Sequence, residues 1–558
     1  MHELDFKKGF YFVPLGGAEE IGMNFNLYGY NDSWIAVDLG ITFTKKLGVD
    51  VVLPDPRFIE EKKDKLLGLV LTHGHEDHIG AIPYLWKKLR CPIYATPFTR
   101  KLVEGKLKDA GLLKQVKIHT LPLSGNIQLG PFDINLINIT HSILEPNLLS
   151  IKTPGGTVVH TGDWKFDDGP CLGNETDKKA LSALGKGNIL AMVCDSTNVF
   201  EPKPSGSEEE VFKGLDKIFQ AYKKERLVFT CFASNLARVS SIARLAKKHG
   251  RKCALAGRSF KRMIAAAQSS GYMCDLPDFI ELEKISSMPK GEVVYITTGS
   301  QGEGRAALSR IANNTYRDIN LEKGDVIIFS SRKIPGNEKE ISHLKNLLVN
   351  KGYEVVFPNS LLKDIKMHVS GHPSQEELTK MYDFIKPEVA IPVHGEAIHL
   401  QAHKDLAYSL GVKKVIVPYN GVVIKLAKNP SIVGEVYAGK LLLDGKDLLS
   451  ENSSVFRERH KMAICGAAAV TLVFNEEEEL EQEPIVTLFG LISEEDPDRS
   501  HGVLKKVTQS IIKMIKEIPY AKRERDELVE ELVAVAVRKS INTMLCKKPI
   551  IDVHIVRL

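Results

Sequence analysis

Long apolar runs, paired cysteines and a leader-like start are all missing from this sequence of 558 residues. The longest apolar stretch, 463–474, is far shorter than the roughly 20 residues that a membrane-spanning helix needs. The eight cysteines are scattered without a CxxC pair, which argues against a disulfide framework and fits reduced thiols. The first residues lack an apolar h-region, so we expect no secretory signal. These absences predict a cytoplasmic protein that does not enter a membrane.

Neither sign of charge dominates the chain. It holds 75 Lys and Arg against 70 Asp and Glu, for a formal net charge of +5. Residues 461–558 contain 14 basic and 17 acidic residues, so the positive excess lies in the first 460 residues. A basic body permits a polyanionic substrate without requiring one. With 43% hydrophobic and 26% charged residues, the composition is that of a globular protein and excludes a disordered, collagen-like or coiled-coil chain.

The length requires several folded lobes, because a domain holds about 100–200 residues. Residues 10–42 alternate short β-rich runs with Gly and Asn turns, which predicts an antiparallel meander. Residues 227–256 have the pattern strand, helix, strand that is typical of a βαβ unit. The last hundred residues predict the order strand, strand, helix, helix, strand. Together these patterns predict an α/β protein.

A histidine-rich turn, THGHEDHIGA at 72–81, carries the strongest chemical signal. It directly follows the apolar run LGLVL, which we expect to be a buried strand. Imidazoles and carboxylates are the ligands that zinc-like ions prefer, and four of them within six residues can serve two ions. A polar surface turn does not need this density of ligands. The turn therefore predicts a metal site, with His73, His75, Asp77 and His78 as candidate ligands.

Three further candidate ligands follow apolar strands elsewhere in the chain. His141 follows FDINLINIT, Asp163 stands in HTGDW after the strand TVV, and His394 ends VAIPVH. Taken singly, each is more common as a core or surface residue than as a ligand. Because all three share a position at the end of a strand, the set as a whole favours a two-metal centre.

Nine motifs follow one another along the chain: PLGGAEEIGMN, HGHEDH, TGD, ASNLAR, GRS, TTGSQGE, IPGNE, HVSGHPSQEEL and PVHGE. HGHEDH with a downstream His and TGD resembles the metallo-β-lactamase superfamily. The complete series, over most of residues 10–400, resembles the β-CASP branch that acts on nucleic acids, and within it the ribonuclease J family. The resemblance implies an α/β fold: an αββα metallo-β-lactamase sandwich with an inserted β-CASP α/β domain and a small C-terminal α/β domain.

The resemblance also implies the domain boundaries. We expect the metallo-β-lactamase domain at 1–200 and 361–440, interrupted by the β-CASP domain at 201–360. A linker at 441–460 and a C-terminal domain at 461–558 follow. In this family such a C-terminal domain promotes oligomerisation, so we expect a homodimer or a homotetramer.

The resemblance divides the seven candidate ligands between two ions, with His73, His75 and His141 on the first, Asp77, His78 and His394 on the second, and Asp163 bridging. Asp38, in AVDLG, resembles a buried carboxylate that orients a ligand imidazole, and a plain turn acid is the alternative. The expected ions are two Zn²⁺ per chain, although Mn²⁺ or Mg²⁺ also accept such ligands.

Other motif residues are implied to act on RNA. His368 in HVSGH and Asp195 in CDSTN resemble catalytic residues, His368 beside the scissile phosphate; a turn histidine and a strand-end acid are the alternatives. HVSGH, which we expect at a helix start, offers a hydroxyl, N–H groups and imidazoles to a 5′-monophosphate. Ser234 and Asn235 resemble further contacts, with a helix N-cap as the alternative. The expected substrate contacts are Ser234, Asn235, His368, Val369, Ser370, Gly371 and His372.

The expected activity is a metal-dependent ribonuclease that degrades single-stranded, 5′-monophosphorylated RNA from 5′ to 3′ and also cuts internally. Its expected roles are RNA turnover and rRNA maturation. One alternative keeps the chemistry and changes the substrate: a DNA-processing or purely endonucleolytic β-CASP enzyme. A second alternative is a metal-free RNA-binding or scaffold subunit, against which the complete ligand set argues.

Overall fold

The computed structural model describes residues 4–44, 48–285, 287–358, 365–427, 429–493 and 495–558. The chain divides into two compact units, the first comprising Met1–Phe43 and Val51–Lys440 and the second Thr44–Asp50 and Leu441–Leu558. Within the described ranges, no helix combines the length and the apolar character needed to cross a membrane.

An eight-stranded sheet forms one half of a sandwich in the first unit. Its opening strands pair antiparallel, which confirms the predicted meander, and β3 then pairs parallel with β6. In spatial order the strands are β22 (Ser431–Glu435), β21 (Val422–Leu426), β1 (Phe10–Gly16), β2 (Phe25–Tyr30), β3 (Ser33–Val37), β6 (Leu66–Val70), β7 (Ile93–Ala95) and β8 (Ile118–Thr120). A short hairpin of β4 (Thr42–Phe43) and β5 (Val51–Pro54) lies between β3 and β6 in the chain.

A seven-stranded sheet forms the other half of the sandwich. Its strands β12, β13 and β19 are parallel neighbours, and β13 and β19 are buried along their whole length, as expected for apolar strands covered on both faces. In spatial order the strands are β20 (Lys414–Val415), β19 (Val389–Val393), β13 (Ile189–Asp195), β12 (Gly156–His160), β11 (Asn147–Thr153), β10 (Phe132–Asn138) and β9 (Asn126–Leu129).

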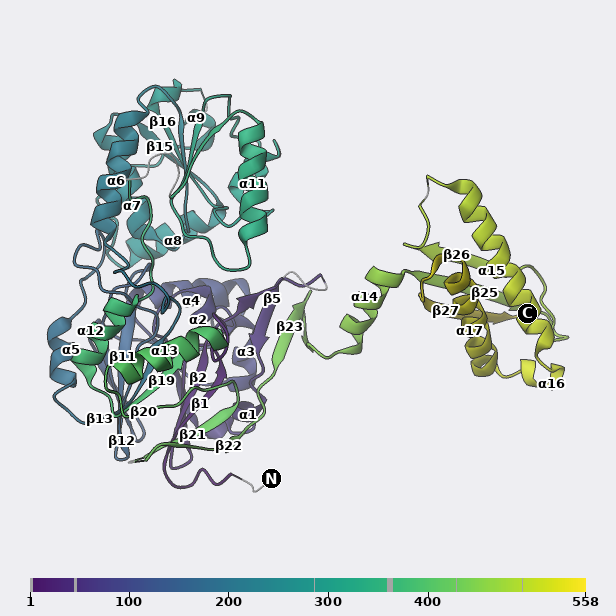
Figure 1. Ribbon diagram of the computed structural model, residues 1–558, viewed down its shortest axis with the longest axis horizontal. Coiled ribbons are helices and arrows are strands. Elements are labelled where there is room, and N and C mark those ends of the chain that lie inside the picture. Colours follow the sequence, from purple (N-terminus) through teal and green to yellow (C-terminus); the bar gives the residue numbers. More distant parts are fainter. Residues whose placement is uncertain (1–3, 45–47, 286, 359–364, 428, 494) are drawn as a thin grey trace. The chain divides into compact units, whose positions relative to one another are not determined.

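Apolar side chains fill the space between the two sheets, among them Phe12 and Ile35 from the first sheet and Leu149 and Val193 from the second. Helices cover the outer faces (Figure 1). This arrangement confirms the predicted αββα sandwich. The helices are α1 (Arg57–Glu60), α2 (Glu76–Ile79), α3 (Ile82–Leu89), α4 (Pro97–Asp109), α5 (Lys178–Leu184), α12 (Gln375–Ile385) and α13 (Ala397–Ser409).

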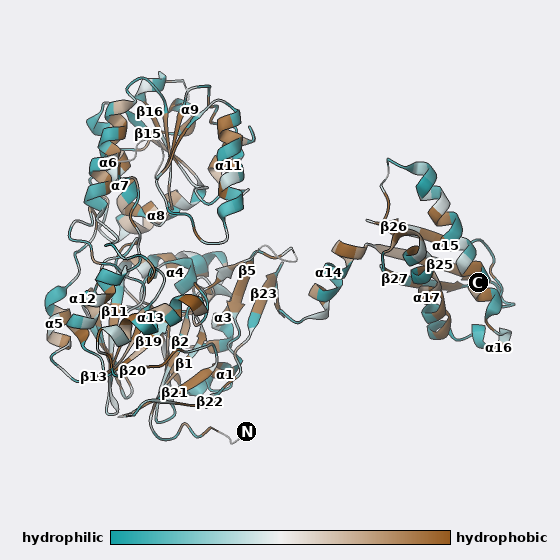
Figure 2. Cartoon of the chain, viewed as in Figure 1, coloured by the Kyte–Doolittle hydropathy of each residue, from teal (hydrophilic) through white to brown (hydrophobic). Residues whose placement is uncertain are grey.

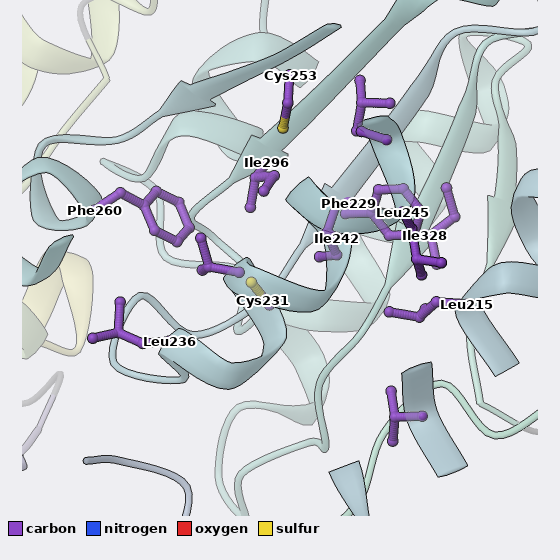
Figure 3. Packing of buried hydrophobic residues seen from close by; sticks show 14 of the residues in the cluster. Leu215, Phe229, Cys231, Leu236, Ile242, Leu245, Cys253, Phe260, Ile296 and Ile328 are labelled. Carbon is purple, nitrogen blue, oxygen red and sulfur yellow. The ribbon is translucent and has the colours of Figure 1, made fainter. Parts of the chain in front are cut away.

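The inserted part is a five-stranded parallel sheet with helices on both faces (Figure 2). On one face, Phe229 and Ile296 pack with Leu215 and Ile242 of the flanking helices (Figure 3). Its strands, in spatial order, are β15 (Lys252–Ala256), β16 (Val293–Thr297), β14 (Leu227–Thr230), β17 (Val326–Phe329) and β18 (Glu354–Val356). Its helices are α6 (Glu208–Ala221), α7 (Leu236–Lys248), α8 (Arg258–Ser269), α9 (Leu282–Ile285), α10 (Ala307–Ala312) and α11 (Glu338–Asn350).

The second unit contains a three-stranded sheet with its own core, and its element order matches the predicted one apart from a short extra helix. The segment 441–460, predicted as a linker, holds regular structure: a hairpin and the start of a helix. The predicted boundary at 360/361 lies outside the described residues. The elements are β23 (Lys440–Asp444), β24 (Asp447–Ser450), α14 (Ser454–Cys465), β25 (Ala467–Phe474), β26 (Ile485–Phe489), α15 (Pro497–Glu517), α16 (Tyr520–Arg523), α17 (Asp526–Leu545) and β27 (Ile550–Arg557).

Candidate metal centre and substrate cavity

The ends of parallel strands bring the predicted residues together. Asp38 directly follows β3, and His73 comes three residues after the parallel neighbour β6. In the other sheet, Asp163 follows β12, Asp195 ends β13 and His394 follows β19. The carboxyl ends of adjacent parallel strands meet at one edge of a sheet, which is where ligand sites form in α/β folds. The common strand-end position therefore has a structural cause.

The first group of candidate ligands is His73, His75 and His141, whose potential ligand atoms all lie within 4.8 Å of one another. Nδ1 of His75 is 3.1 Å from Nε2 of His73 and 3.1 Å from Nε2 of His141. Burial lowers the pKa of all three imidazoles, that of His75 to about 4. They are therefore neutral at pH 7, which is the form that binds metal ions.

The second group is Asp77, His78, Asp163 and His394. One oxygen of Asp163 lies 3.2 Å from Nε2 of His78 and 3.6 Å from Nε2 of His394. The same oxygen is 4.0 Å from Nε2 of His73 and 3.9 Å from Nε2 of His141 in the first group. Asp163 thus faces both groups, as the resemblance implied for a bridging carboxylate.

Hydrogen-bond acceptors fix the tautomers of three of these histidines. Nδ1 of His78 donates to Asp38 at 2.7 Å, and Nδ1 of His141 donates to the carbonyl oxygen of Gly371 at 2.5 Å. The hydroxyl of Thr72 donates to Asp38 at 2.8 Å, so it accepts from Nδ1 of His73 at 3.0 Å. In a neutral imidazole the second nitrogen then carries a lone pair. The Nε2 lone pairs of the neutral His73 and His141 consequently face the cluster. Burial lowers the pKa of His78, but Asp163, Asp77 and Asp38 raise it well above its usual value, so its Nε2 offers a lone pair only once that proton is lost.

Asn24 is a functional candidate that the sequence analysis did not single out. Its side-chain amide lies 2.8 Å from Nδ1 of His394 and 3.1 Å from Nε2 of His78, and it is 3% exposed. It stands in the opening motif PLGGAEEIGMN, so the motif was visible although the role of its last residue was not.

His372 forms an ion pair with the buried Asp195, with Nδ1 of His372 2.8 Å from the carboxylate. The other oxygen of Asp195 accepts hydrogen bonds from the backbone and hydroxyl of Thr197. Burial lowers the pKa of His372, but the nearby carboxylates, led by Asp195, raise it more, to about 9. His372 therefore carries a positive charge at neutral pH.

His368 lies in an extended segment and not at a helix start, because α12 begins at Gln375 with Ser374 as its N-cap. Among the described residues, Nδ1 of His368 has no hydrogen-bond partner although the atom is buried. Burial, reinforced by the positive charge of Arg238, holds the pKa of this imidazole well below its usual range. A buried polar atom without a partner is uncommon and needs a group that completes it.

The remaining predicted contacts divide into two kinds. Ser370 and Gly371 line the cavity beside His372, and so does Ser234. Asn235 also lines it, but its side chain caps α7 by accepting from the N–H of Arg238, as in the N-cap alternative. The side chain of Val369 packs in the hydrophobic core of the inserted part, so only its backbone is available to a substrate.

One cavity of about 470 Å³ connects the two ligand groups with the HVSGH segment. It lies at the junction of the sandwich and the inserted part, since residues from both line it. The predicted site residues on its wall are His75, Asp77, His141, Asp163, Ser234, Asn235, His368, Ser370, Gly371, His372 and His394.

Comparisons with known proteins agree with this geometry. Family models match the chain at 24–172 (metallo-β-lactamase superfamily), 224–348 (ribonuclease J, β-CASP domain), 364–418 (Zn-dependent metallo-hydrolase RNA specificity domain) and 454–558 (ribonuclease J C-terminal domain). The protein named Ribonuclease J from Sinorhizobium meliloti is 38% identical over 100% of this chain and 99% of its own length. The chain belongs to the ribonuclease J family.

Other ribonuclease J relatives are similar along their length. Ribonuclease J of Helicobacter pylori is 33% identical over 99% of this chain and 80% of its own. Ribonuclease J2 of Bacillus subtilis is 31% identical over 96% of each. The crystal structure of a protein of unknown function from Enterococcus faecalis V583 shares the fold over 75% of this chain and 99% of its own, with a TM-score of 0.51 and 17% identity.

Membership of the ribonuclease J family confirms the prediction of a metal-dependent, hydrolytic ribonuclease. The residues fit the divalent ions that the superfamily implies. Nδ1 of His75 lies 3.1 Å from Nε2 of His73 and 3.1 Å from Nε2 of His141, so three ring nitrogens converge on one small region, as the ligands of a shared cation do. A set of imidazoles and carboxylates is also the donor chemistry that zinc-like ions take.

Proposed function

We propose that this chain removes nucleotides from the 5′ end of single-stranded RNA, prefers a 5′-monophosphate and also cuts internally. The observation that carries the proposal is the single cavity shared by both ligand groups and HVSGH. A phosphate held by HVSGH lies next to the candidate metal ligands, so the end of the strand and the bond to be cut are bound together. This arrangement favours stepwise removal of nucleotides.

The metal ions of the proposal are two per chain, most simply Zn²⁺, with Mn²⁺ or Mg²⁺ as alternatives that the ligands also accept. His73, His75 and His141 would hold the first, and Asp77, His78 and His394 the second, with Asp163 shared. Ions bound there would lower the pKa of an attacking water and offset the charge that builds up on the phosphate. Asp38 would keep His78 in the tautomer that binds a metal.

The phosphate contacts of the proposal come from HVSGH. His372 is held as a cation by Asp195 and offers a charge-assisted hydrogen bond to a phosphate oxygen. Ser370 offers a hydroxyl, and Gly371 lets the segment approach His141 closely, because a Cβ there would lie 2.7 Å from Oγ of Ser142 and 2.8 Å from Cε1 of His141. The unpartnered Nδ1 of His368 is available to the scissile phosphate or the leaving oxygen.

The proposed setting is RNA turnover and rRNA maturation in the cytoplasm, by a homodimer or homotetramer. The C-terminal unit supports the oligomer, because it has a core of its own and matches the ribonuclease J C-terminal domain.

The test compares one RNA with a 3′ label that carries either a 5′-monophosphate or a 5′-triphosphate. Wild type, His75→Ala and His372→Ala are incubated with each RNA, with and without a chelator. We expect wild type to release mononucleotides, faster from the monophosphate. His75→Ala and the chelator should abolish cleavage of both RNAs, whereas His372→Ala should reduce mainly the preference between them.

Other outcomes point to the alternatives. If the products are internal fragments, whichever group the 5′ end carries, the protein is an endonuclease and not an exonuclease. If a 2′-deoxy strand is cleaved as fast as the RNA, the result favours a DNA-processing enzyme. Bound but uncut RNA, with less than one metal ion per chain, would mean a scaffold subunit.

A further inference from the structure

The rim of the cavity carries large apolar side chains that neither the metal chemistry nor the phosphate contacts use. Phe43, Phe200 and Ile334 come from three separate segments, all line the cavity, and are 68%, 52% and 43% exposed. A single exposed apolar residue is ordinary on a protein surface. Several around one cavity indicate a surface that binds something apolar.

Phe200 is held at a fixed place relative to the HVSGH segment. Two residues before it, the amide of Asn198 donates to the hydroxyl of Ser370 at 2.6 Å and to the carbonyl oxygen of His372 at 3.0 Å. One residue after it, the carbonyl oxygen of Glu201 accepts from the N–H of Gln375 at 2.9 Å. The segment that carries Phe200 is thus tied to HVSGH before the ring and to the first residue of α12 after it.

The ring of Phe200 rests on the ring of His399 in the first turn of α13. Their centroids are 5.1 Å apart and the planes are inclined by 59°. Among the described residues, Nδ1 of His399 has no hydrogen-bond partner, so nothing polar draws this ring away from Phe200. Phe200 is backed by His399 on one side, is half exposed and lines the cavity, so it offers an aromatic face there.

We propose that Phe200, supported by His399, stacks on an unpaired nucleobase of the RNA beside the HVSGH phosphate contacts, and thereby selects single-stranded substrate. The inference rests on the proposed function and adds the residue that distinguishes single-stranded from double-stranded RNA. Every nucleobase has a π-face, so stacking on an aromatic ring is tolerant of sequence and is worth about tenfold or more in binding. A base inside a duplex is already paired and stacked, and Phe200 cannot reach its face.

The experiment removes the base and the ring separately. The substrates are a 5′-monophosphorylated RNA and three matched RNAs in which one of the first three nucleotides lacks its base. The enzymes are wild type, Phe200→Ala, Phe200→Leu, which keeps apolar volume without a π-face, and Phe200→Trp, which restores one. We measure kcat and KM separately for each combination of enzyme and RNA, together with the melting temperature of each enzyme.

We expect one abasic position to lower kcat/KM of wild type about tenfold. Phe200→Ala and Phe200→Leu should raise KM for the intact RNA about tenfold. In these two variants the abasic position should no longer lower kcat/KM. Phe200→Trp should keep KM and the effect of the abasic position near the wild-type values. Ile398→Ala is the matched control, because Ile398 is 62% exposed next to His399 but is not part of the cavity wall. It should leave every value unchanged.

The inference is overturned if Phe200→Leu behaves as wild type, or if the abasic penalty survives in Phe200→Ala. Either result with an RNA-degrading wild type leaves the proposed function intact. A wild type that degrades no RNA would overturn the proposed function and this inference with it.

Discussion

At the scale of the residue, the metal cluster depends on which nitrogen of each histidine carries the proton. Asp38, Thr72 and the carbonyl oxygen of Gly371 each accept from an Nδ1, so the Nε2 atoms of His78, His73 and His141 are the ones that face the cluster. Two of these acceptors lie outside the histidine-rich motif. The ligand residues are therefore prepared for a cation by groups that coordinate nothing themselves.

Replacing Asp38 by Asn should weaken metal binding without removing a candidate ligand. The amide offers one acceptor oxygen in place of two, so it cannot accept both from the backbone N–H of Thr72 and from Nδ1 of His78 without turning its NH2 group toward one of these donors. We expect affinity for Zn²⁺ to fall about 10- to 100-fold, measured by competition with a chromogenic chelator. Asp64→Asn, on the exposed turn Lys63–Lys65, is the control and should change nothing. Equal affinity in the two variants would contradict this role of Asp38.

His403 should make stability depend on pH. It is fully buried between the hydroxyls of Ser196 and Tyr382, and burial lowers its pKa to about 4, against about 6.5 in the unfolded chain. Between these values only the unfolded chain takes up the proton, so the free energy of unfolding decreases as pH falls, by about 1.4 kcal/mol per unit. The contribution of the neutral His403 to the free energy of unfolding is therefore complete above pH 6.5 and is lost progressively toward pH 4.

Urea unfolding of wild type and His403→Gln at several pH values from 4.5 to 7.5 checks this. The glutamine can bond to both hydroxyls but does not titrate. We expect the advantage of wild type over the variant to shrink as the pH falls below 6.5. Two parallel pH profiles would show that His403 does not carry the effect.

At the scale of the element, strands were predictable where they are apolar and buried. The runs at 66–70, 189–195 and 389–393 are continuous apolar segments, and each is a buried strand that leads to a predicted site residue. Because ligands follow such strands, the sequence predicts much of the candidate site before the sheets are known. The order of the strands in space could not be predicted from the sequence, because β13 and β19 are neighbours although about two hundred residues separate them in the chain.

Polar segments were harder to predict. HVSGH was expected at a helix start, yet the helix begins only at Gln375, because Ser374 and Glu377 complete a capping box there. The side chains of Asn24 and Asn198 meet their partners only in the folded chain, so even the motif PLGGAEEIGMN, which contains Asn24, does not indicate the contact with His394. The segment 441–460 contains β23 and β24 because LLLD and DLLS pair around a tight turn, which its polar flanks concealed.

The loop after β3 must lie very close to α2, and Gly40 makes this possible. A Cβ at Gly40 would stand 1.6 Å from the carbonyl oxygen of Asp77, a backbone atom that has little freedom to move. We expect Gly40→Ala to destabilise the fold by about 3 kcal/mol or more and to abolish Zn²⁺ binding, as measured by denaturation and metal analysis. Gly105→Ala, at an exposed helical position with open space around it, should instead stabilise by about 0.5–1 kcal/mol. Similar melting temperatures for the two variants would contradict the close approach.

At the scale of the whole molecule, the C-terminal part, residues 454–558, matches the ribonuclease J C-terminal domain. Its apolar core is made only of residues from 468 onward. A chain that ends after Asn452, just before α14, should keep its fold and metal content but run as a monomer in light scattering, whereas the full chain should be a dimer or larger. A monomeric full-length chain, or a truncated chain that still associates, would place the oligomer interface elsewhere or exclude it.

Because the inserted part interrupts the sandwich, the candidate ligands leave the ribosome at widely separated times. A ribosome releases His73, His75, Asp77 and His78 early, but His394 emerges only after the whole inserted part has been made. Domains fold as they leave the ribosome, so the nascent sandwich has six of its seven candidate ligands, but lacks His394 and the β19 strand until the inserted part has been made. The ligand set of an RNA-cutting enzyme built in this order is complete only after most of its message has been translated.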